Sequence, residues 1–161
     1  MKWTIVAAVV IVAVLAAALL PRKSVHAELL IGVPPAVVWN ALMDSSSYGD
    51  WNPIFTRVDG VFAEGETMAL SMTTSDGGST DIEVVVKEMI PGQKLHQSAG
   101  IPGVLTANHQ WLVEEVSQGT RVTQHEEYRG VGVLFYDPTY VQDLYQQGLE
   151  NLRKRLEGEA R

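Results

Sequence analysis

The chain of 161 residues contains no cysteine and is short of basic residues. The lack of cysteine excludes disulfides, thiol catalysis and thiolate metal sites. Only 12 residues are Lys or Arg against 19 Asp or Glu, which gives a formal net charge of −7. Residues 24–161 hold 9 of the basic residues and all 19 acidic ones, a poor composition for contact with a phosphate backbone. We therefore expect no nucleic-acid partner.

Motifs for catalysis and metal binding are also missing. The chain has no nucleophile elbow, no glycine-rich phosphate-binding loop and no metal-ligand spacing. Its four histidines, at positions 26, 96, 109 and 125, fall on different predicted strands. We expect neither a metal nor another cofactor. These absences favour binding over catalysis, although general acid–base chemistry needs none of the missing motifs.

A single long apolar run lies near the start of the chain. Residues 4–20 carry no charge and are followed by Pro21-Arg22-Lys23. As a helix the run would span about 25 Å, against a hydrocarbon core of ~30 Å. We expect residues 1–23 to be a single-pass membrane anchor and residues 24–161 to be the ligand-binding domain. The alternative is a signal peptide cleaved after Ala27, which would give a secreted or periplasmic protein.

The last stretch, residues 138–157, predicts a long amphipathic helix. Asp137 and Pro138 suit its start, and Gly158 can end it. Apolar side chains recur every three or four residues and form one stripe. The stripe consists of Val141, Leu144, Tyr145, Gly148, Leu149, Leu152 and Leu156.

Most of the remaining chain alternates with period two, which is typical of strands. We expect one strand at 24–33 and two short helices at 36–43 and 48–52. Six further strands are expected at 54–62, 66–74, 80–90, 94–99, 104–116 and 120–133. A sheet with one apolar face and a helix with one apolar stripe must cover each other, so the sequence predicts an α+β fold.

The order of several short motifs resembles one superfamily. The stretch VPPAVVWNALMDSSSYGDWNP, residues 33–53, is similar to the opening of START-like (Bet v 1-like) proteins, in the polyketide cyclase/dehydrase or SRPBCC branch. Further similarities are Ile90-Pro91-Gly92, His109 with Trp111, and Gly119-Thr120-Arg121 leading to Glu126, Tyr128 and Gly130. The apolar run before the first strand also resembles membrane-anchored members of this group.

This resemblance implies a helix-grip fold, in which a seven-stranded curved antiparallel sheet wraps around the C-terminal helix. Two short helices would plug one end. Such proteins usually enclose a cavity between sheet and helix for lipids, sterols, polyketides or other apolar molecules, and the helix would form one wall. The superfamily contains cyclases and dehydratases as well as ligand carriers, so membership does not decide between enzyme and binding protein.

Strand alternation predicts which polar side chains face the interior. On the last strand, Gln124 and Glu126 share a face with Tyr128; on the strand before it, His109 shares a face with Trp111. The hairpin between these strands should bring His109 and Glu126 close enough to act as a general acid–base pair. The alternative is that the buried polar groups satisfy one another.

We expect the ligand to contact inward residues from the sheet and the helix. The candidates are Trp51, Met68, Leu70, Met72, His109, Trp111, Gln124, Glu126, Tyr128, Tyr145 and Gly148. Two of them have a second interpretation. Trp51 could plug the end of the cavity, and Gly148 could either leave room for a ligand or let a bulky strand side chain approach.

Three hypotheses follow for function. The first is membrane-anchored binding of a small hydrophobic ligand or lipid. The second is a cyclase- or dehydratase-like enzyme that uses Glu126 and His109. The third is a structural or partner-binding domain with no open cavity, whose interior is filled by Trp39, Trp51, Trp111 and Tyr145.

Overall fold

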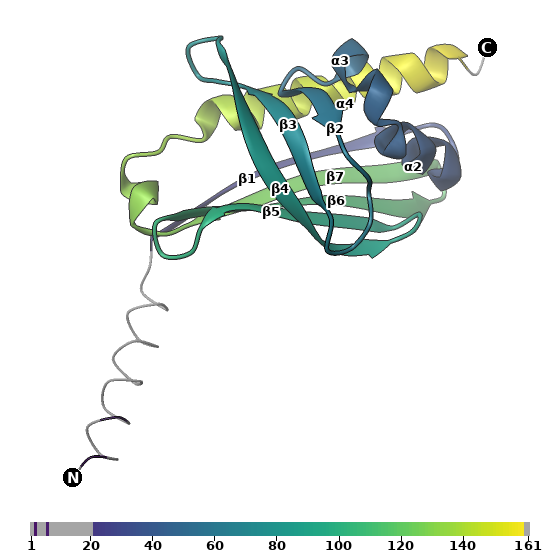
Figure 1. The fold of residues 1–161 in the computed structure, drawn as a ribbon. Helices are drawn as coiled ribbons and strands as arrows, with labels where there is room; N and C mark the ends of the chain where they lie inside the picture. Colours follow the sequence, from purple (N-terminus) through teal and green to yellow (C-terminus); the bar gives the residue numbers. More distant parts are fainter. Residues whose placement is uncertain (1, 3–5, 7–20, 160–161) are drawn as a thin grey trace.

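The protein is an α+β fold in a computed structural model that describes residues 2, 6 and 21–159. A long strand is followed by three short helical segments, six more strands, a 3-10 turn and a long C-terminal helix (Figure 1). The elements are β1 (Arg22–Ile31), α2 (Pro35–Met43), η1 (Ser45–Ser47), α3 (Tyr48–Trp51), β2 (Phe55–Asp59), β3 (Thr67–Thr73), β4 (Ser79–Ile90), β5 (Lys94–Ile101), β6 (Leu105–Val116), β7 (Gly119–Arg129), η2 (Val131–Leu134) and α4 (Thr139–Glu159).

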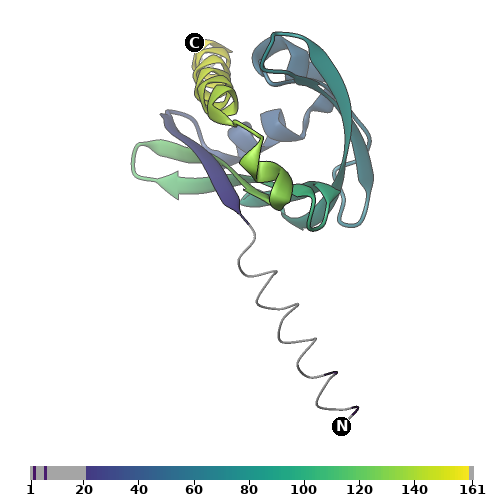
Figure 2. The ribbon, with the colours of Figure 1, turned by 90° about the vertical axis from the view of Figure 1, so that its left-hand side faces the viewer.

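The seven strands form one antiparallel sheet in the order β1-β7-β6-β5-β4-β3-β2. Strands β2 to β7 are joined as successive hairpins, and the first strand, β1, pairs with the last strand, β7. Figure 2 shows the sheet curving around an interior that α4 closes from one side. This is the helix-grip arrangement, and the seven strands expected from the alternation are confirmed.

Helix α4 seals the free edge of β1. The side chain of Gln142 hydrogen-bonds the backbone of His26 in both directions, and the N–H of Gly32 donates to Glu157 Oε1 over 2.9 Å. An exposed strand edge invites pairing with other chains, and covering it with a helix removes that hazard. The apolar stripe turns inward: Tyr145, Leu149 and the other predicted members are buried, except that Leu144 is only partly so.

Some boundaries differ from those expected. Strand β1 begins at Arg22, inside the region assigned to the anchor, because Arg22 and Lys23 pair with Arg129 and Tyr128. The last strand ends at Arg129 rather than at residue 133. Gly130 takes a φ of 127°, and a Cβ there would lie 2.4 Å from the carbonyl oxygen of Val104, so the chain turns at a glycine.

Two predictions at the chain ends have different outcomes. Gly158 does not end the long helix, because α4 continues to Glu159. The predicted transmembrane run, residues 4–20, lies outside the described residues apart from position 6. Among the residues that the structure describes, no helix is long and apolar enough to cross a membrane.

Candidate ligand cavity

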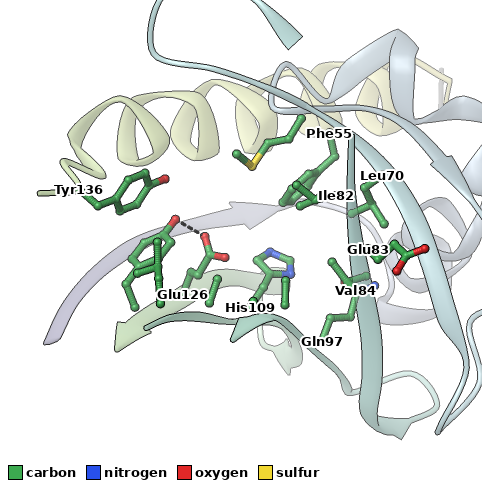
Figure 3. A pocket seen from close by; sticks show the side chains of 15 residues that line it. Phe55, Leu70, Ile82, Glu83, Val84, Gln97, His109, Glu126 and Tyr136 are labelled. Atoms are coloured by element: carbon green, nitrogen blue, oxygen red, sulfur yellow. Dashed lines mark hydrogen bonds between the residues drawn. The ribbon is translucent and has the colours of Figure 1, made fainter. Parts of the chain in front are cut away.

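A cavity of about 350 Å³ lies against the concave face of the sheet (Figure 3). Its walls come from strands β2 to β7 and from Tyr136, just before α4, and most of them are apolar. The lining residues are Phe55, Leu70, Met72, Ile82, Glu83, Val84, Gln97, Ala99, Gly100, Leu105, Ala107, His109, Glu126, Tyr128 and Tyr136.

Glu126 is the acidic group on the buried side of this cavity. Two phenols, Tyr128 and Tyr145, donate hydrogen bonds to its Oε2, the second over 2.7 Å. The other oxygen, Oε1, has no hydrogen-bond partner among the described residues. Burial raises the pKa of Glu126, and the two phenol hydrogen bonds oppose that rise without cancelling it. The carboxyl of Glu126 is therefore easier to protonate than that of an exposed glutamate.

His109 lies directly opposite Glu126 in the pairing of β6 with β7. Its Nε2 is 3.0 Å from the amide nitrogen of Gln124. An amide nitrogen can only donate, so Nε2 accepts and the imidazole proton is on Nδ1. His109 is only 5% exposed, and its Nδ1 has no hydrogen-bond partner in the described part of the chain. An N–H that is buried without a partner costs about 1–3 kcal/mol.

Aromatic rings surround the imidazole and keep it uncharged. The rings of Phe55, Trp111 and Tyr145 have their centres 5.4, 5.6 and 5.6 Å from that of His109. Burial lowers the pKa of His109 from 6.5 to about 3. His109 and Glu126 are thus adjacent without forming an ion pair. Together they place two polar groups side by side in a mostly apolar cavity.

The structure separates the predicted ligand contacts into two groups. Five of them line the cavity: Leu70, Met72, His109, Glu126 and Tyr128. The other six are buried behind or beside it: Trp51, Met68, Trp111, Gln124, Tyr145 and Gly148. Ligand contact remains a prediction for the first group, while the second group supports the walls. Gln124 and Tyr145, for example, orient His109 and Glu126.

Helix α4 is not a wall of this cavity, contrary to the expectation from the sequence, because no residue of Thr139–Glu159 lines it. The reason is the size of the side chains beneath the helix. The rings of Trp51 and Trp111 meet edge to face 6.3 Å apart, and a Cβ added at Gly148 would lie 3.3 Å from Pro53. The space under α4 is therefore filled, and the observed contact favours the close-packing interpretation of Gly148.

The hypothesis of a filled interior accounts for only part of the molecule. Trp39, Trp51, Trp111 and Tyr145 are all buried as that hypothesis expects. Their side chains leave the cavity along β3 to β6 open. The sheet therefore encloses both a solid core and a hollow.

Several lining residues were not predicted from the sequence. Ile82 and Val84 alternate in phase on β4, and Leu105 alternates in phase with His109, so period two could have found them. Tyr136 lies in a loop, where no periodicity applies. Its proximity to Tyr128, with ring centres 4.9 Å apart, is a product of the tertiary fold.

The described residues offer no constellation for a metal. No group of three His, Asp or Glu side chains among them lies close enough together to hold an ion. The polar residues that line the cavity are Glu83, which is exposed, Gln97, His109, Glu126 and the two tyrosines. They can hydrogen-bond a bound molecule or exchange protons with it.

Solved structures share this architecture. A protein of Chromobacterium violaceum superposes with a TM-score of 0.68 at 17% identity, over 84% of this chain and 98% of that one. A protein of Nitrosomonas europaea gives a TM-score of 0.66 at 18% identity, over 85% and 96%. DynU16, from the dynemicin biosynthetic locus, gives a TM-score of 0.67 at 16% identity, over 85% of this chain and 48% of that one. At sequence identities of 16–18%, the structural similarity establishes that these proteins share the fold of this chain.

The sequence itself is matched at the level of a family. No curated protein matches the chain. The profile of the family described as "Polyketide cyclase / dehydrase and lipid transport" matches residues 22–157, which is nearly the whole described domain. The resemblance of the motifs between residues 33 and 130 is thereby confirmed. The chain belongs to the polyketide cyclase/dehydrase and lipid transport family.

Proposed function

We propose that the protein binds a small, uncharged, mostly apolar molecule that carries an oxygen acceptor, and that it does so at a membrane. The observation that carries the proposal is the apolar cavity of about 350 Å³ lined by His109, whose Nδ1 has no hydrogen-bond partner in the described part of the chain. A binding site of this kind needs apolar walls and a few placed polar groups. The carboxyl of Glu126 is a second polar group beside the first.

The charge of the cavity limits the class of ligand. No Lys or Arg lines the cavity, its acidic residues are Glu83 and Glu126, and burial lowers the pKa of His109 to about 3. A fatty-acid carboxylate or a phosphate would enter without a cationic partner, and burying such a charge is costly. Ketones, alcohols, esters and polyketide-like molecules fit this cavity better.

A matched pair of probes tests this proposal. Fluorene and fluorenone have nearly the same shape, and only fluorenone carries a carbonyl. We expect the full chain in detergent to prefer fluorenone by about 2- to 12-fold, which corresponds to one net hydrogen bond. His109→Phe should abolish the preference while fluorene still binds. Comparing variants in the same micelles cancels partition into detergent. No saturable binding of either probe, or an unchanged preference in His109→Phe, would refute the proposal.

The membrane location rests on the sequence of residues 4–20 and on the pairing of β1. Cleavage after Ala27 would remove the first six residues of β1, which pair with Arg129 to Gln124 of β7. This loss favours the uncleaved anchor over the signal peptide. Mass spectrometry of the membrane fraction tests the point. We expect the intact N-terminus, and a mature protein beginning at Glu28 would contradict the anchor.

A second candidate function is acid–base catalysis, and the position of Glu126 beside His109 in the cavity favours it. In a β-hydroxy ketone, the Nδ1–H of His109 would hydrogen-bond the carbonyl oxygen. The carboxylate of Glu126 would remove the proton next to the carbonyl and pass it to the departing hydroxyl, and the products are the enone and water. The probe is 4-hydroxy-4-phenyl-2-butanone, whose enone absorbs in the near ultraviolet. Glu126→Gln should abolish turnover and retain fluorene binding. Absence of turnover in the wild type would leave binding as the function.

A further inference from the structure

Large apolar side chains are exposed at one end of the molecule. Phe135 is 91% exposed, and Leu134, Ile101, Val104 and Val131 are between 51% and 66% exposed. They come from the turn between β5 and β6 and from the segment of η2. We call these five residues the apolar rim. Exposed apolar residues gathered in one place mark interaction surfaces, whereas scattered ones need no explanation.

The two segments of the rim are fixed to each other. The N–H of Val131 donates to the carbonyl of Gly103 over 3.1 Å, and the N–H of Gly132 donates to that of Val104 over 2.7 Å. Gly130 permits this close approach, since any side chain there would clash with the backbone of Val104. The rim is therefore one surface, and Figure 1 shows η2 and the β5–β6 turn side by side at the end where β1 begins.

The rim borders the mouth of the cavity. Lining residues such as Gly100, Leu105 and Tyr136 are exposed or partly exposed, whereas His109 and Val84 further in are buried. The exposure of the lining thus increases toward the rim. In the sequence, Gly100, Leu105 and Tyr136 directly adjoin Ile101, Val104 and Phe135. A molecule that leaves or enters the cavity at this end passes the rim.

The chain also enters the domain at the rim. The carbonyl of Pro21 accepts a hydrogen bond from the N–H of Gly130 over 3.2 Å. The uncharged residues 4–20 directly precede Pro21 in the sequence. Next to it, Lys23 donates to the carbonyl of Tyr136 over 2.6 Å. In the sequence, the basic pair Arg22 and Lys23 thus follows the apolar residues 4–20, and in the fold it adjoins the apolar rim. Cations take such a position at the headgroup level of a bilayer.

From these positions we propose that the apolar rim inserts into the bilayer and sets the cavity mouth against the lipid. The inference rests on the proposed function, because it assumes a membrane anchor and an apolar cargo. It adds the orientation of the domain and the path of the ligand, which moves between bilayer and cavity past Leu134 and Phe135 without crossing water. A lipid surface fits this site because the chain that precedes Pro21 is itself suited to a bilayer.

The absence of native cysteine allows a direct test. Leu134→Cys, in the rim, and Ser75→Cys, in the exposed β3–β4 turn at the same end of the strands, are each labelled with the fluorophore NBD. The full chain is reconstituted into phosphatidylcholine vesicles with or without 12-doxyl phosphatidylcholine. We expect the label at position 134 to shift to shorter wavelength and to be quenched several-fold more than the label at position 75.

The matched position 75 separates insertion from mere proximity, since both sites are held close to the membrane by the same anchor. Equal and weak quenching at both positions would overturn the proposal. A wavelength shift that grows with the protein-to-lipid ratio without quenching by doxyl lipid would mean that a second copy covers the rim. A shift independent of that ratio and insensitive to doxyl lipid would mean that the apolar run folds onto it. Either result refutes insertion.

Failure of this inference is distinguishable from failure of the proposed function. The fluorenone preference is measured in detergent, where rim insertion plays no part. A rim that is not quenched together with an intact, His109-dependent preference would refute only the docking. A quenched rim together with no saturable probe binding would refute the cavity function and retain the docking.

Discussion

The interior beneath α4 and the interior along β3 to β6 belong to the same curved sheet, yet one is solid and the other hollow. Under α4, Trp51 packs against Trp111, Tyr145 packs against His109, and Gly148 lets Pro53 approach. Along the hollow half the sheet presents small side chains such as Ala99 and Ala107. Side-chain volume, more than topology, therefore determines where this fold has a cavity.

The two halves also use their polar groups differently. In the solid half, Asn151 donates to the carbonyl of Trp51 over 3.0 Å and Gln142 pairs with the β1 edge, so these groups hold the helix in place. In the hollow half, the Nδ1 of His109 is left unpaired. Polar groups in the solid half hold the fold together, whereas in the hollow half one buried nitrogen has no partner among the described residues.

The largest expected effect compares the same substitution in the two halves. Leu149 is buried under α4, and Leu70 is buried at the cavity wall. Leu149→Ala should lower the free energy of unfolding by about 4 kcal/mol, near the upper part of the usual range, because every side of the leucine is packed. Leu70→Ala should cost about 2 kcal/mol, because one side already faces a void. Denaturant unfolding of the full chain in detergent measures both, and equal losses would remove the distinction.

A second substitution overfills the solid half. Gly148→Leu places a side chain against Pro53, so we expect a loss of about 1–3 kcal/mol in the free energy of unfolding. Because the cavity is elsewhere, the fluorenone preference of the folded fraction should be unchanged. Gly148→Ala is the graded control and should cost less. A stable Gly148→Leu variant without probe binding would instead place the ligand under α4.

The third prediction concerns the pH dependence of stability. The folded pKa of Glu126 is raised above its usual 4.5, so just above pH 4.5 the folded state keeps a proton that the unfolded state has lost. Stability therefore falls as pH rises through this window, by about 1.4 kcal/mol per pH unit. Glu126→Gln should remove this fall. Unfolding free energies measured from pH 4 to pH 8 provide the test.

His109 contributes the opposite slope. Its folded pKa of about 3 lies below the usual 6.5, so between these values only the unfolded state binds the proton and stability rises with pH. Just above pH 4.5 the two slopes oppose each other in the wild type. Glu126→Gln should then show a rising slope and His109→Phe a falling one. Identical pH profiles in all three proteins would contradict the shifts.

The smallest effect on stability is expected from filling the hollow half. Ala107→Leu adds a side chain that can extend into the cavity, so the free energy of unfolding should change by less than about 1.5 kcal/mol while probe binding is lost. Gln110→Leu, on the same strand and the opposite face, is the matched control and should bind fluorenone as the wild type does. If Ala107→Leu retained full binding, the cavity along β3 to β6 would not be the ligand site.

Local sequence patterns were sufficient to predict the order of elements and the inward faces of the strands. Alternation marked Glu126, Gln124 and His109 as inward, because a strand side chain points to one face or the other with period two. It missed details governed by single contacts. The end of β7 at Arg129, for example, depends on the approach of Gly130 to the Val104 carbonyl, 26 residues earlier in the sequence.

Which inward residues share a cavity depends on how the strands are arranged in the folded protein. Trp111 and His109 are two residues apart on β6 and point to the same face of the sheet, yet Trp111 lies in the solid core and His109 lines the cavity. The physical reason is that free volume depends on the summed sizes of side chains from several strands, and this sum is not a property of any one stretch. The family resemblance implied a cavity under α4. In the structure the large side chains fill that space, and the cavity lies beside the helix with its mouth at the apolar rim.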